Sequence, residues 1–435
     1  MIRSLTGILL AGVLAAPVSA ADFVKVRGTH FEIQGRPYYF LGTNFWEGMN
    51  LASQGPGGDR ARLRRELDRL HGLGVDNLRI IAASEGPDTE PWRIVPAVQK
   101  APGVYDPALL DGLDYLLSEM GKRGMRAVVV LNNFWPWSGG MVQYVAWSRK
   151  TSIPYPPPAA NGDWDTYQRY SASFYKDQKA LAWFRKFLRA VVQRKNGYTK
   201  MRYQDDPTIM SWQLANEPRG GGDAAALEGW IRDTAALIKS LDRHHLVTTG
   251  CEGETPWPKA TGLDFVKDHS IPGIDYATMH IWAQNWGWYD PAQEKETYGA
   301  AVAKMAAYFD DHVAKARTFG KPLVLEEFGL MRDSGDFEPR AGTAARDRYY
   351  GTVFSKVFDA AQASSPVAGV NFWAWAGEGR PTQPGGIWKA GEPFIGDPPH
   401  ERQGWYSVYD GDSATVKLIG EWAGKMRSLI LERGR

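Results

Sequence analysis

The segment TIMSWQLANEP, residues 208–218, is an apolar run of strand length that ends in Asn-Glu-Pro, with the glutamate at Glu217. A second run, KPLVLEEFG at residues 321–329, ends in Glu327 followed by Phe-Gly. Each run places a carboxylate at the C-terminal tip of a predicted strand, where a parallel β/α barrel builds its active site. Paired carboxylates of this kind are typical of glycoside hydrolysis.

Strand and helix patterns alternate along the rest of the chain, which favours a parallel sheet. Eight strands are predicted at residues 38–43, 76–81, 126–131, 208–214, 246–250, 276–280, 322–326 and 368–372. Helices are predicted at residues 59–74, 107–122, 181–193, 224–241, 294–318, 344–362 and 416–432, with a weak position between strands five and six. The pattern predicts a (β/α)8 TIM barrel with long loops at its C-terminal face, and a short hairpin at residues 23–34 that caps the bottom.

The first twenty residues resemble a signal peptide. Arg3 precedes an apolar run, and Val-Ser-Ala at residues 18–20 is a small-x-small cleavage pattern. We expect cleavage after Ala20, secretion to the periplasm or the medium, and one catalytic domain over residues 21–435. The single cysteine, Cys251, is expected to be a buried apolar side chain.

Composition excludes several classes of partner. Lysine and arginine number 51 against 49 aspartates and glutamates, so the charge balance indicates neither nucleic acid nor acidic lipid. The eight histidines form no HExxH motif, and glycine-rich phosphate signatures are absent. We therefore expect no metal or cofactor and no binding to nucleic acid or membranes. We also expect a monomer.

The segment 132–179 lacks a clean period and carries Trp135, Trp137, Trp147 and Trp164. A loop of this length in a compact domain is usually functional or disordered, and its aromatic content argues against disorder. We expect it to wall one side of an open cleft. A purely structural flap is the alternative.

The second carboxylate could be either Glu326 or Glu327. A retaining reaction needs two carboxyl groups ~5–5.5 Å apart, one as the acid and one as the nucleophile. Different environments can hold one protonated and the other ionised. Successive strand residues face opposite sides, so only one of the two glutamates can face the site, but alternation alone does not choose between them.

At these motifs the chain resembles glycoside hydrolase family 5 over nearly the whole sequence after residue 20. The resemblance implies that Glu217 is the acid/base, that Asn216 binds the sugar 2-hydroxyl and that Glu327 is the nucleophile. Arg79 resembles the arginine that orients the nucleophile, although an arginine there could be a structural ion pair. An arginine side chain offers a planar donor fork suited to a carboxylate.

Three further positions match family residues. His280, after strand six, resembles the active-site histidine, although a lone histidine there is often a core residue. Trp373 resembles the tryptophan platform under the sugar on the non-reducing side of the cut, and Trp375 could share that face or pack. The family usually has tyrosine where this chain has Trp282, which could stack on sugar instead.

Two motifs indicate the subgroup. NNFWPWSGGMVQYV, which begins at Asn132, resembles the loop after strand three in endo-β-mannanases and is one residue longer. QGWYSVYDGD at residues 403–412 is also similar to that group. We count Asn132 among the substrate-binding residues. Glu252 and Glu378 are read as substrate contacts or, equally, as surface groups.

The sequence therefore predicts a secreted, retaining, endo-acting hydrolase of β-1,4-mannosidic bonds in mannan, glucomannan or galactomannan. An endo-β-1,4-glucanase of the same family is the first alternative. The second is a carbohydrate-binding barrel that has lost catalysis.

Overall fold

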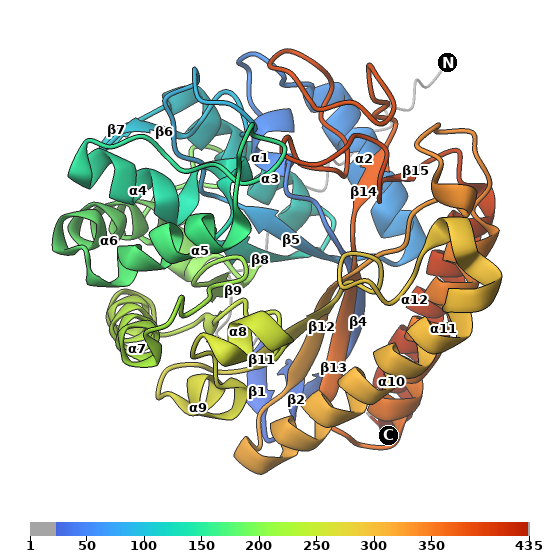
Figure 1. The fold of residues 1–435 in the computed structure, drawn as a ribbon. Coiled ribbons are helices and arrows are strands. Elements are labelled where there is room, and N and C mark those ends of the chain that lie inside the picture. Colours follow the sequence, from blue (N-terminus) through green and yellow to red (C-terminus); the bar gives the residue numbers. More distant parts are fainter. Residues whose placement is uncertain (1–22, 434–435) are drawn as a thin grey trace, which may run out of the picture.

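The computed structural model describes residues 23–433, and its central feature is a barrel of eight parallel strands inside a ring of helices (Figure 1). In spatial order the strands are β10 (Leu246–Thr248), β9 (Ile209–Gln213), β8 (Arg126–Val130), β5 (Asn77–Ile81), β4 (Phe40–Asn44), β13 (Val367–Phe372), β12 (Leu323–Phe328) and β11 (Ala277–Ile281). Each coincides with a predicted strand. The predicted (β/α)8 fold is confirmed.

The barrel closes between β10 and β11 through an isolated parallel bridge. Thr248 faces Tyr276 there, and the threonine hydroxyl donates to the Tyr276 carbonyl at 2.9 Å. The other neighbouring strands pair through longer ladders.

Helices cover the outside of the barrel as expected. They are α2 (Arg60–Leu73), α3 (Pro107–Lys122), α6 (Gln178–Val192), α7 (Ala224–Leu241), α10 (Glu294–Phe319), α11 (Ala344–Gln362) and α12 (Ser413–Arg433). Shorter helices are α1 (Gly48–Leu51), α8 (Pro256–Ala260), α9 (Phe265–Ser270) and the 3-10 turns η3 (Tyr203–Asp205), η4 (Pro291–Gln293) and η5 (Asp333–Gly335). The short α8 and α9 fill the weak position between strands five and six. None of the described helices is both long and apolar enough to cross a bilayer.

In helix α2 the sequence determines both the buried face and the two ends of the helix. Leu63, Leu67 and Leu70 repeat at helical spacing and are all fully buried. Asp59 accepts from the backbone of Arg62 at 2.8 Å and caps the N-terminus. Gly74 ends the helix in the left-handed region.

The bottom of the barrel is capped by β1 (Lys25–Arg27), β2 (His30–Ile33) and β3 (Arg36–Tyr38). The predicted hairpin thus has a third strand, and Tyr38 belongs to it and not to the barrel strand. Phe31 packs in a buried cluster with the first residues of several barrel strands, among them Phe40 and Val324. The cap therefore replaces solvent at the end opposite the active site. The predicted signal peptide, residues 1–20, lies outside the described residues.

The segment 132–179 is more regular than its sequence indicates. It contains η1 (Pro136–Ser138), α4 (Gly140–Arg149), α5 (Trp164–Ala172) and η2 (Ser173–Lys176). Residues 140–146 of α4 are buried on every side, so the helix has no polar face to reveal a period.

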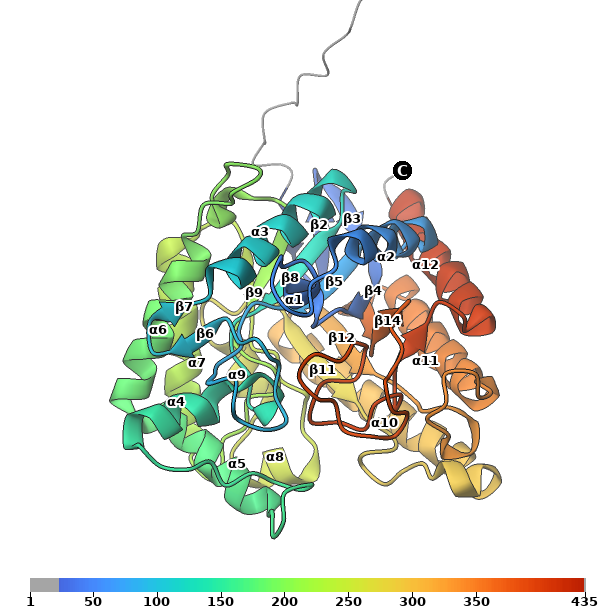
Figure 2. The same cartoon turned by 90° about the horizontal axis from the view of Figure 1, so that it is seen from above.

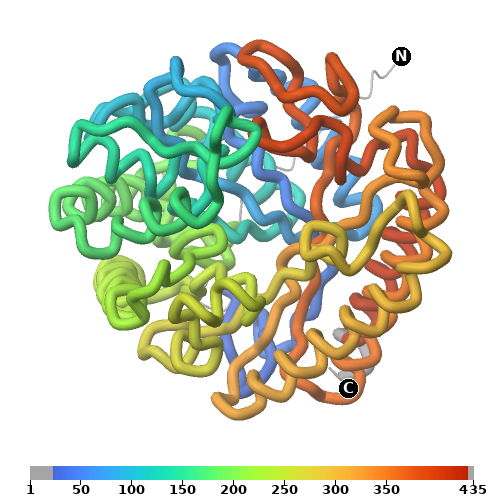
Figure 3. The backbone as a smooth tube through the Cα atoms, in the orientation of Figure 1, coloured from blue at the N-terminus to red at the C-terminus, as the bar shows by residue number. Residues whose placement is uncertain are grey.

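A second extension, residues 378–407, was not predicted to line the cavity, although its last residues belong to the QGWYSVYDGD motif. It connects β14 (Trp375–Gly377) to β15 (Val408–Tyr409), which pair with each other. Figures 2 and 3 show this red segment folded over the C-terminal face beside the blue chain that follows β4. The Trp46 indole donates to the Gly396 carbonyl at 2.9 Å, which ties the two together. A small hairpin of β6 (Gln99–Ala101) and β7 (Val104–Tyr105) completes this side.

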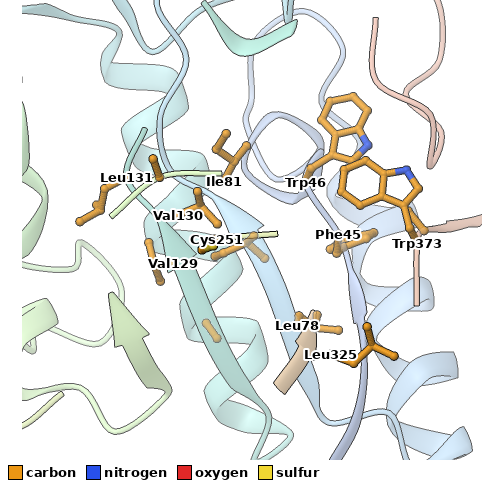
Figure 4. Packing of buried hydrophobic residues seen from close by; sticks show 14 of the residues in the cluster. Phe45, Trp46, Leu78, Ile81, Val129, Val130, Leu131, Cys251, Leu325 and Trp373 are labelled. Carbon is orange, nitrogen blue, oxygen red and sulfur yellow. The ribbon is translucent and has the colours of Figure 1, made fainter. Parts of the chain in front are cut away.

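The apolar interior extends up to the strand ends. In Figure 4, Trp46 and Trp373 lie above Leu78 and Leu325 of the barrel. Cys251 belongs to the same cluster and is 2% exposed, as expected for a buried apolar side chain.

Candidate active site

A cavity of about 430 Å³ opens at the C-terminal ends of the strands. It is lined by both long segments, 132–179 and 378–407, together with the ends of β9, β11, β12 and β13. Seven tryptophans border it: Trp135, Trp137, Trp164, Trp282, Trp286, Trp373 and Trp405. The expected cleft wall formed by segment 132–179 is thus present.

Glu217 lies directly after β9 and reaches into this cavity. Its φ of 49° is in the left-handed region, where a non-glycine residue is strained, and such strain concentrates at functional sites. Its Oε1 lies 2.7 Å from Nδ1 of His280, and its Oε2 accepts from the indole of Trp135 at 2.5 Å. Both oxygens are therefore held in place.

Glu327, at the end of β12, faces Glu217. Its Oε1 accepts from the Arg79 guanidinium, and its Oε2 accepts from the indole of Trp282 at 3.2 Å. Nδ1 of His280 lies 3.3 Å from Oε2 of Glu327. The histidine thus stands between the two carboxylates.

Glu326 is turned away from the cavity, as the alternation of strand side chains requires. It is fully buried and accepts from the Gln213 amide beneath the site. The structure therefore places Glu327, and not Glu326, opposite Glu217.

Arg79, on β5, organises the floor of the site. It is 3% exposed and donates to Asn44 at 3.0 Å, Gln213 at 2.8 Å and Asn216 at 2.7 Å, in addition to Glu327. It forms a buried ion pair with Glu327 and thereby fixes the orientation of that carboxylate. Asn216 is oriented through this bond and lines the cavity.

The two carboxylates are close enough to act on one bond. One oxygen of Glu217, one of Glu327 and a ring nitrogen of His280 lie within 4.8 Å of one another. In the chain from residue 23 to 433, these three residues are the group that could hold a metal ion. The Arg79 guanidinium and two indole N–H groups already occupy those carboxylates, so the donors present oppose a cation.

The surroundings of the two carboxyl groups give them different pKa values. Burial raises the pKa of Glu217, but the hydrogen bond and charge of His280 outweigh it and lower that pKa to about 2. Burial raises the pKa of Glu327 above its usual value, against the charges of His280 and Arg79. Burial lowers the pKa of His280, but the charges of Glu327 and Glu217 outweigh it and raise it to about 10. The proton of the site is therefore held at the His280–Glu217 pair.

This order of pKa values is the reverse of the expected one, since Glu217, as the acid, was expected to have the raised pKa. The reason is His280, which carries the proton next to Glu217 before substrate enters. The sequence motif of Glu217 contains no sign of that partner.

The remaining predicted residues divide into two groups. Trp282 and Trp373 line the cavity, and their rings contact each other at 5.8 Å. Asn132 is fully buried beneath the cavity, and its carbonyl accepts from the backbone of Asn216 at 2.9 Å. It is not among the residues that line the cavity, and a role in substrate binding stays a prediction.

The open alternatives for three other residues are resolved. Trp375 is fully buried and donates to Glu66 at 2.9 Å, so it packs. Glu378 pairs on the surface with Arg65 at 2.7 Å. Glu252 lines the cavity and pairs with Arg219 at 2.6 Å, and burial raises its pKa to about 8.

Several cavity residues were assigned no individual role from the sequence. Trp135 binds Glu217, and the Arg219 guanidinium lies over the Trp135 ring at 4.6 Å. Trp137 packs edge-on against Trp373 at 6.4 Å. Glu401 lies in the 378–407 segment. Aromatic residues in segment 132–179 gave the only hint, and it did not single out which of them faces the site.

We predict that Trp282→Phe lowers kcat/KM about 10-fold, because it removes one hydrogen bond to a charged carboxylate. Trp282→Tyr should recover part of this loss and shift the pH profile, which steady-state kinetics would record. Trp288→Phe is the control, since Trp288 packs against Trp286 outside the cavity. A Trp282→Phe rate equal to wild type would exclude a role in holding Glu327.

Comparisons with known proteins agree with this geometry. Residues 21–430 match the family model described as GH family 5 beta-mannosidase-like. The chain is 33% identical over 373 residues to mannan endo-1,4-beta-mannosidase 5 of Solanum lycopersicum, covering 82% of each. It is 32% identical to mannan endo-1,4-beta-mannosidase 7 of Arabidopsis thaliana, covering 81% of this chain and 78% of the relative.

Among solved structures, the chain is also similar to a member of glycoside hydrolase family 5. The glycoside hydrolase family 5 mannosidase from Rhizomucor miehei superimposes with a TM-score of 0.88 at 37% identity, covering 95% of this chain and all of that one. A mutant of that protein was solved in complex with mannosyl-fructose.

Proposed function

Since the chain belongs to glycoside hydrolase family 5, in its β-mannosidase-like group, we propose that it hydrolyses β-1,4-mannosidic bonds with retention of configuration. The observation that carries the proposal is the facing pair of Glu217 and Glu327, whose oxygens lie within 4.8 Å across His280. This spacing suits a mechanism in which one carboxylate is the nucleophile. A mechanism in which water attacks directly needs a separation of ~6.5–9.5 Å between the two carboxyl groups.

In the first step Glu327 attacks the anomeric carbon, while Glu217 protonates the oxygen of the leaving sugar. The proton comes from the His280–Glu217 hydrogen bond of 2.7 Å. In the second step Glu217 takes a proton from water, which displaces Glu327 from the sugar. Arg79 and Trp282 stabilise the ionised Glu327 before attack and after release.

Mannan, glucomannan and galactomannan are the proposed substrates, supported by the names of the curated relatives and by the loop motif that begins at Asn132. We also propose that the protein is secreted, which the signal-peptide pattern of residues 1–20 supports, and that it acts as a monomer.

Reducing-sugar release from glucomannan, galactomannan and carboxymethyl-cellulose tests the substrate. Cleavage of the cellulose derivative without any of the mannans would favour the endoglucanase alternative. Binding of mannan without turnover would favour a carbohydrate-binding barrel. Inversion of the anomeric configuration, seen by NMR in the first product, would refute the double displacement.

The point of attack has two candidates. The sequence and the names of the relatives favour endo-action. Attack near a chain end is the second candidate, since Trp373, the expected platform on the non-reducing side, packs against a buried aromatic cluster. Trp137 contacts both Trp373 and Trp46, and Trp46 packs on Phe394 at 5.8 Å. All four side chains are buried.

The viscosity of a mannan solution separates these two modes. Endo-action lowers viscosity long before much reducing sugar is released, whereas chain-end attack releases mannose or mannobiose at nearly constant viscosity. The products of mannopentaose, followed by chromatography, give the number of sugars accepted beyond Trp373.

The pH dependence of kcat/KM should be bell-shaped. Glu327 must be ionised, and its pKa is raised by burial, so activity should fall as the pH drops through a value above 4.5. The His280–Glu217 pair must keep its proton, and the raised pKa of His280 puts the loss at about 10 as the pH rises. His280→Asn should move the alkaline limb. An unchanged limb would show that another group holds the proton.

A further inference from the structure

A third carboxylate lies directly beneath the site, and the reaction above does not use it. Glu326 is fully buried on β12, next to Glu327 in the chain. Its Oε2 accepts from the Gln213 amide, and its Oε1 has no hydrogen-bond partner among residues 23–433. Burying a carboxylate costs free energy unless charges or hydrogen bonds compensate for the lost water, so the position of Glu326 needs an explanation.

The lower face of the His280 ring is turned towards Glu326. Nδ1 of His280 lies 2.7 Å from Glu217 and 3.3 Å from Glu327. Nε2 of the same ring is buried and has no hydrogen-bond partner in the part of the chain that the structure describes. Oε2 of Glu326 lies 3.9 Å from this Nε2. Both nitrogens of the ring therefore have a carboxylate on their side.

Glu326 is held in this position by the neighbouring strands. Gln213 on β9 donates to its Oε2 and at the same time accepts from Nε of Arg79 at 2.8 Å. Nε of Arg79 also lies 3.5 Å from Oε2 of Glu326. The Glu326 carbonyl accepts from the side-chain amide of Asn44 at 2.8 Å. The carboxylate is thus fixed on the side of His280 away from the cavity.

The surroundings of His280 are negatively charged. The charged and titratable groups around it are Glu217 and Arg219 after β9, Glu252 after β10, Glu326 and Glu327 on β12, Arg79 on β5 and Tyr276 on its own strand. Glu252 pairs with Arg219 at 2.6 Å, so three carboxylates remain beside Arg79 and His280. Burial lowers the pKa of His280, but Glu327, Glu217 and Glu326 outweigh it and raise that pKa to about 10. A carboxylate this close stabilises the charged form of the ring.

We propose that Glu326 is a positioning residue that keeps a proton on Nε2 of His280, so that the ring stays charged and its Nδ1 donates to Glu217. The bond that one ring nitrogen makes sets the protonation of the other. When the Nδ1 proton passes to Glu217 and Glu217 protonates the leaving oxygen, the ring becomes neutral and keeps its Nε2 proton. The inference rests on the proposed mannosidic activity and names the group that prepares its acid.

A role as counter-charge to Arg79 alone is the alternative for Glu326. In that case its loss would lower stability and leave the protonation of His280 unchanged. Glu326→Gln distinguishes the two, since the amide has nearly the same shape and no charge. Glu66→Gln is the matched control, because Glu66 is equally buried and pairs with Arg62 and Arg69 outside the cavity.

Glu326→Gln should move the alkaline limb of kcat/KM to lower pH by ~1–3 units, the effect of removing an opposite charge beside a titrating group. The loss of activity should therefore grow with pH, while Glu66→Gln lowers the Tm and leaves the limb in place. Nitrogen NMR of histidine-labelled protein should show His280 losing its proton at the same lower pH. His280→Asn assigns its signals.

Glu326→Asp serves if the neutral variant does not fold. It keeps the counter-charge of Arg79 and lengthens the gap to His280, so its titration should move in the same direction by a smaller amount. A wild-type His280 titration in either Glu326 variant would overturn the proposal, and so would an equal displacement in Glu66→Gln.

The NMR titration also separates this inference from the proposed function, because it needs no substrate. If wild type cleaves no mannoside, the proposed function fails, and the His280 signals still decide the role of Glu326. If wild type cleaves mannosides and His280 titrates as before in both Glu326 variants, only the inference fails.

Discussion

Glu327→Ala is expected to lower kcat/KM by ~10⁴- to 10⁶-fold, the effect of removing a catalytic nucleophile. No neighbour replaces it, because Glu326 is turned under the site and bound to Gln213. Added azide should restore part of the activity, because a small anion can enter the space left by the side chain. The azide product should then have the inverted anomeric configuration.

Glu217→Ala is the matched control for this experiment. It removes the acid and leaves the nucleophile, so a dinitrophenyl glycoside, whose leaving group needs no proton, should still form the glycosyl-enzyme rapidly. Polymeric substrates should be cleaved ~10²- to 10⁴-fold more slowly. If Glu327→Ala shows this leaving-group pattern and Glu217→Ala does not, the two assignments must be exchanged.

Arg79→Ala is expected to affect both activity and stability. Four hydrogen-bond partners lose their donor, and the buried carboxylates of Glu326 and Glu327 lose their counter-charge. Breaking a buried ion pair by removing one partner costs ~3–5 kcal/mol, which denaturant unfolding would measure. Activity should fall on the order of 10²- to 10³-fold, as for other donors that stabilise charge in an active site.

Arg79→Lys separates the charge from the geometry. Lysine keeps the positive charge but cannot reach Asn44, Gln213, Asn216 and Glu327 at once, so stability should recover more than activity. An Arg79→Ala protein with wild-type stability and rate would contradict the arrangement described above.

The barrel could be predicted because its strands are buried on both faces. Residues 209–213 and 126–130 are almost entirely buried and appear in the sequence as short apolar runs between helical patterns. The motifs at Glu217 and Glu327 could be placed for the same reason, since each ends such a run. The family resemblance selected Glu327 over Glu326, and the structure places Glu327 in the cavity.

The contacts between loops could not be predicted. Trp135 reaches Glu217 from a chain position 82 residues away, and no local pattern marks that hydrogen bond. The depth of Asn132 could not be predicted either, because nothing in the motif shows that Asn132 and Asn133 are both fully buried. The order of the carboxyl pKa values depends on the charge of His280, which only three-dimensional proximity reveals.

The wall beside Trp373 is built from two segments, 132–179 and 378–407, and neither contributes a strand to the barrel. The proposed catalytic pair, Glu217 and Glu327, therefore lies outside both of the segments that shape the cavity wall. We expect changes in the length of either segment to alter the shape of the cleft while the catalytic pair is kept. Relatives with shorter versions of these segments would test this expectation.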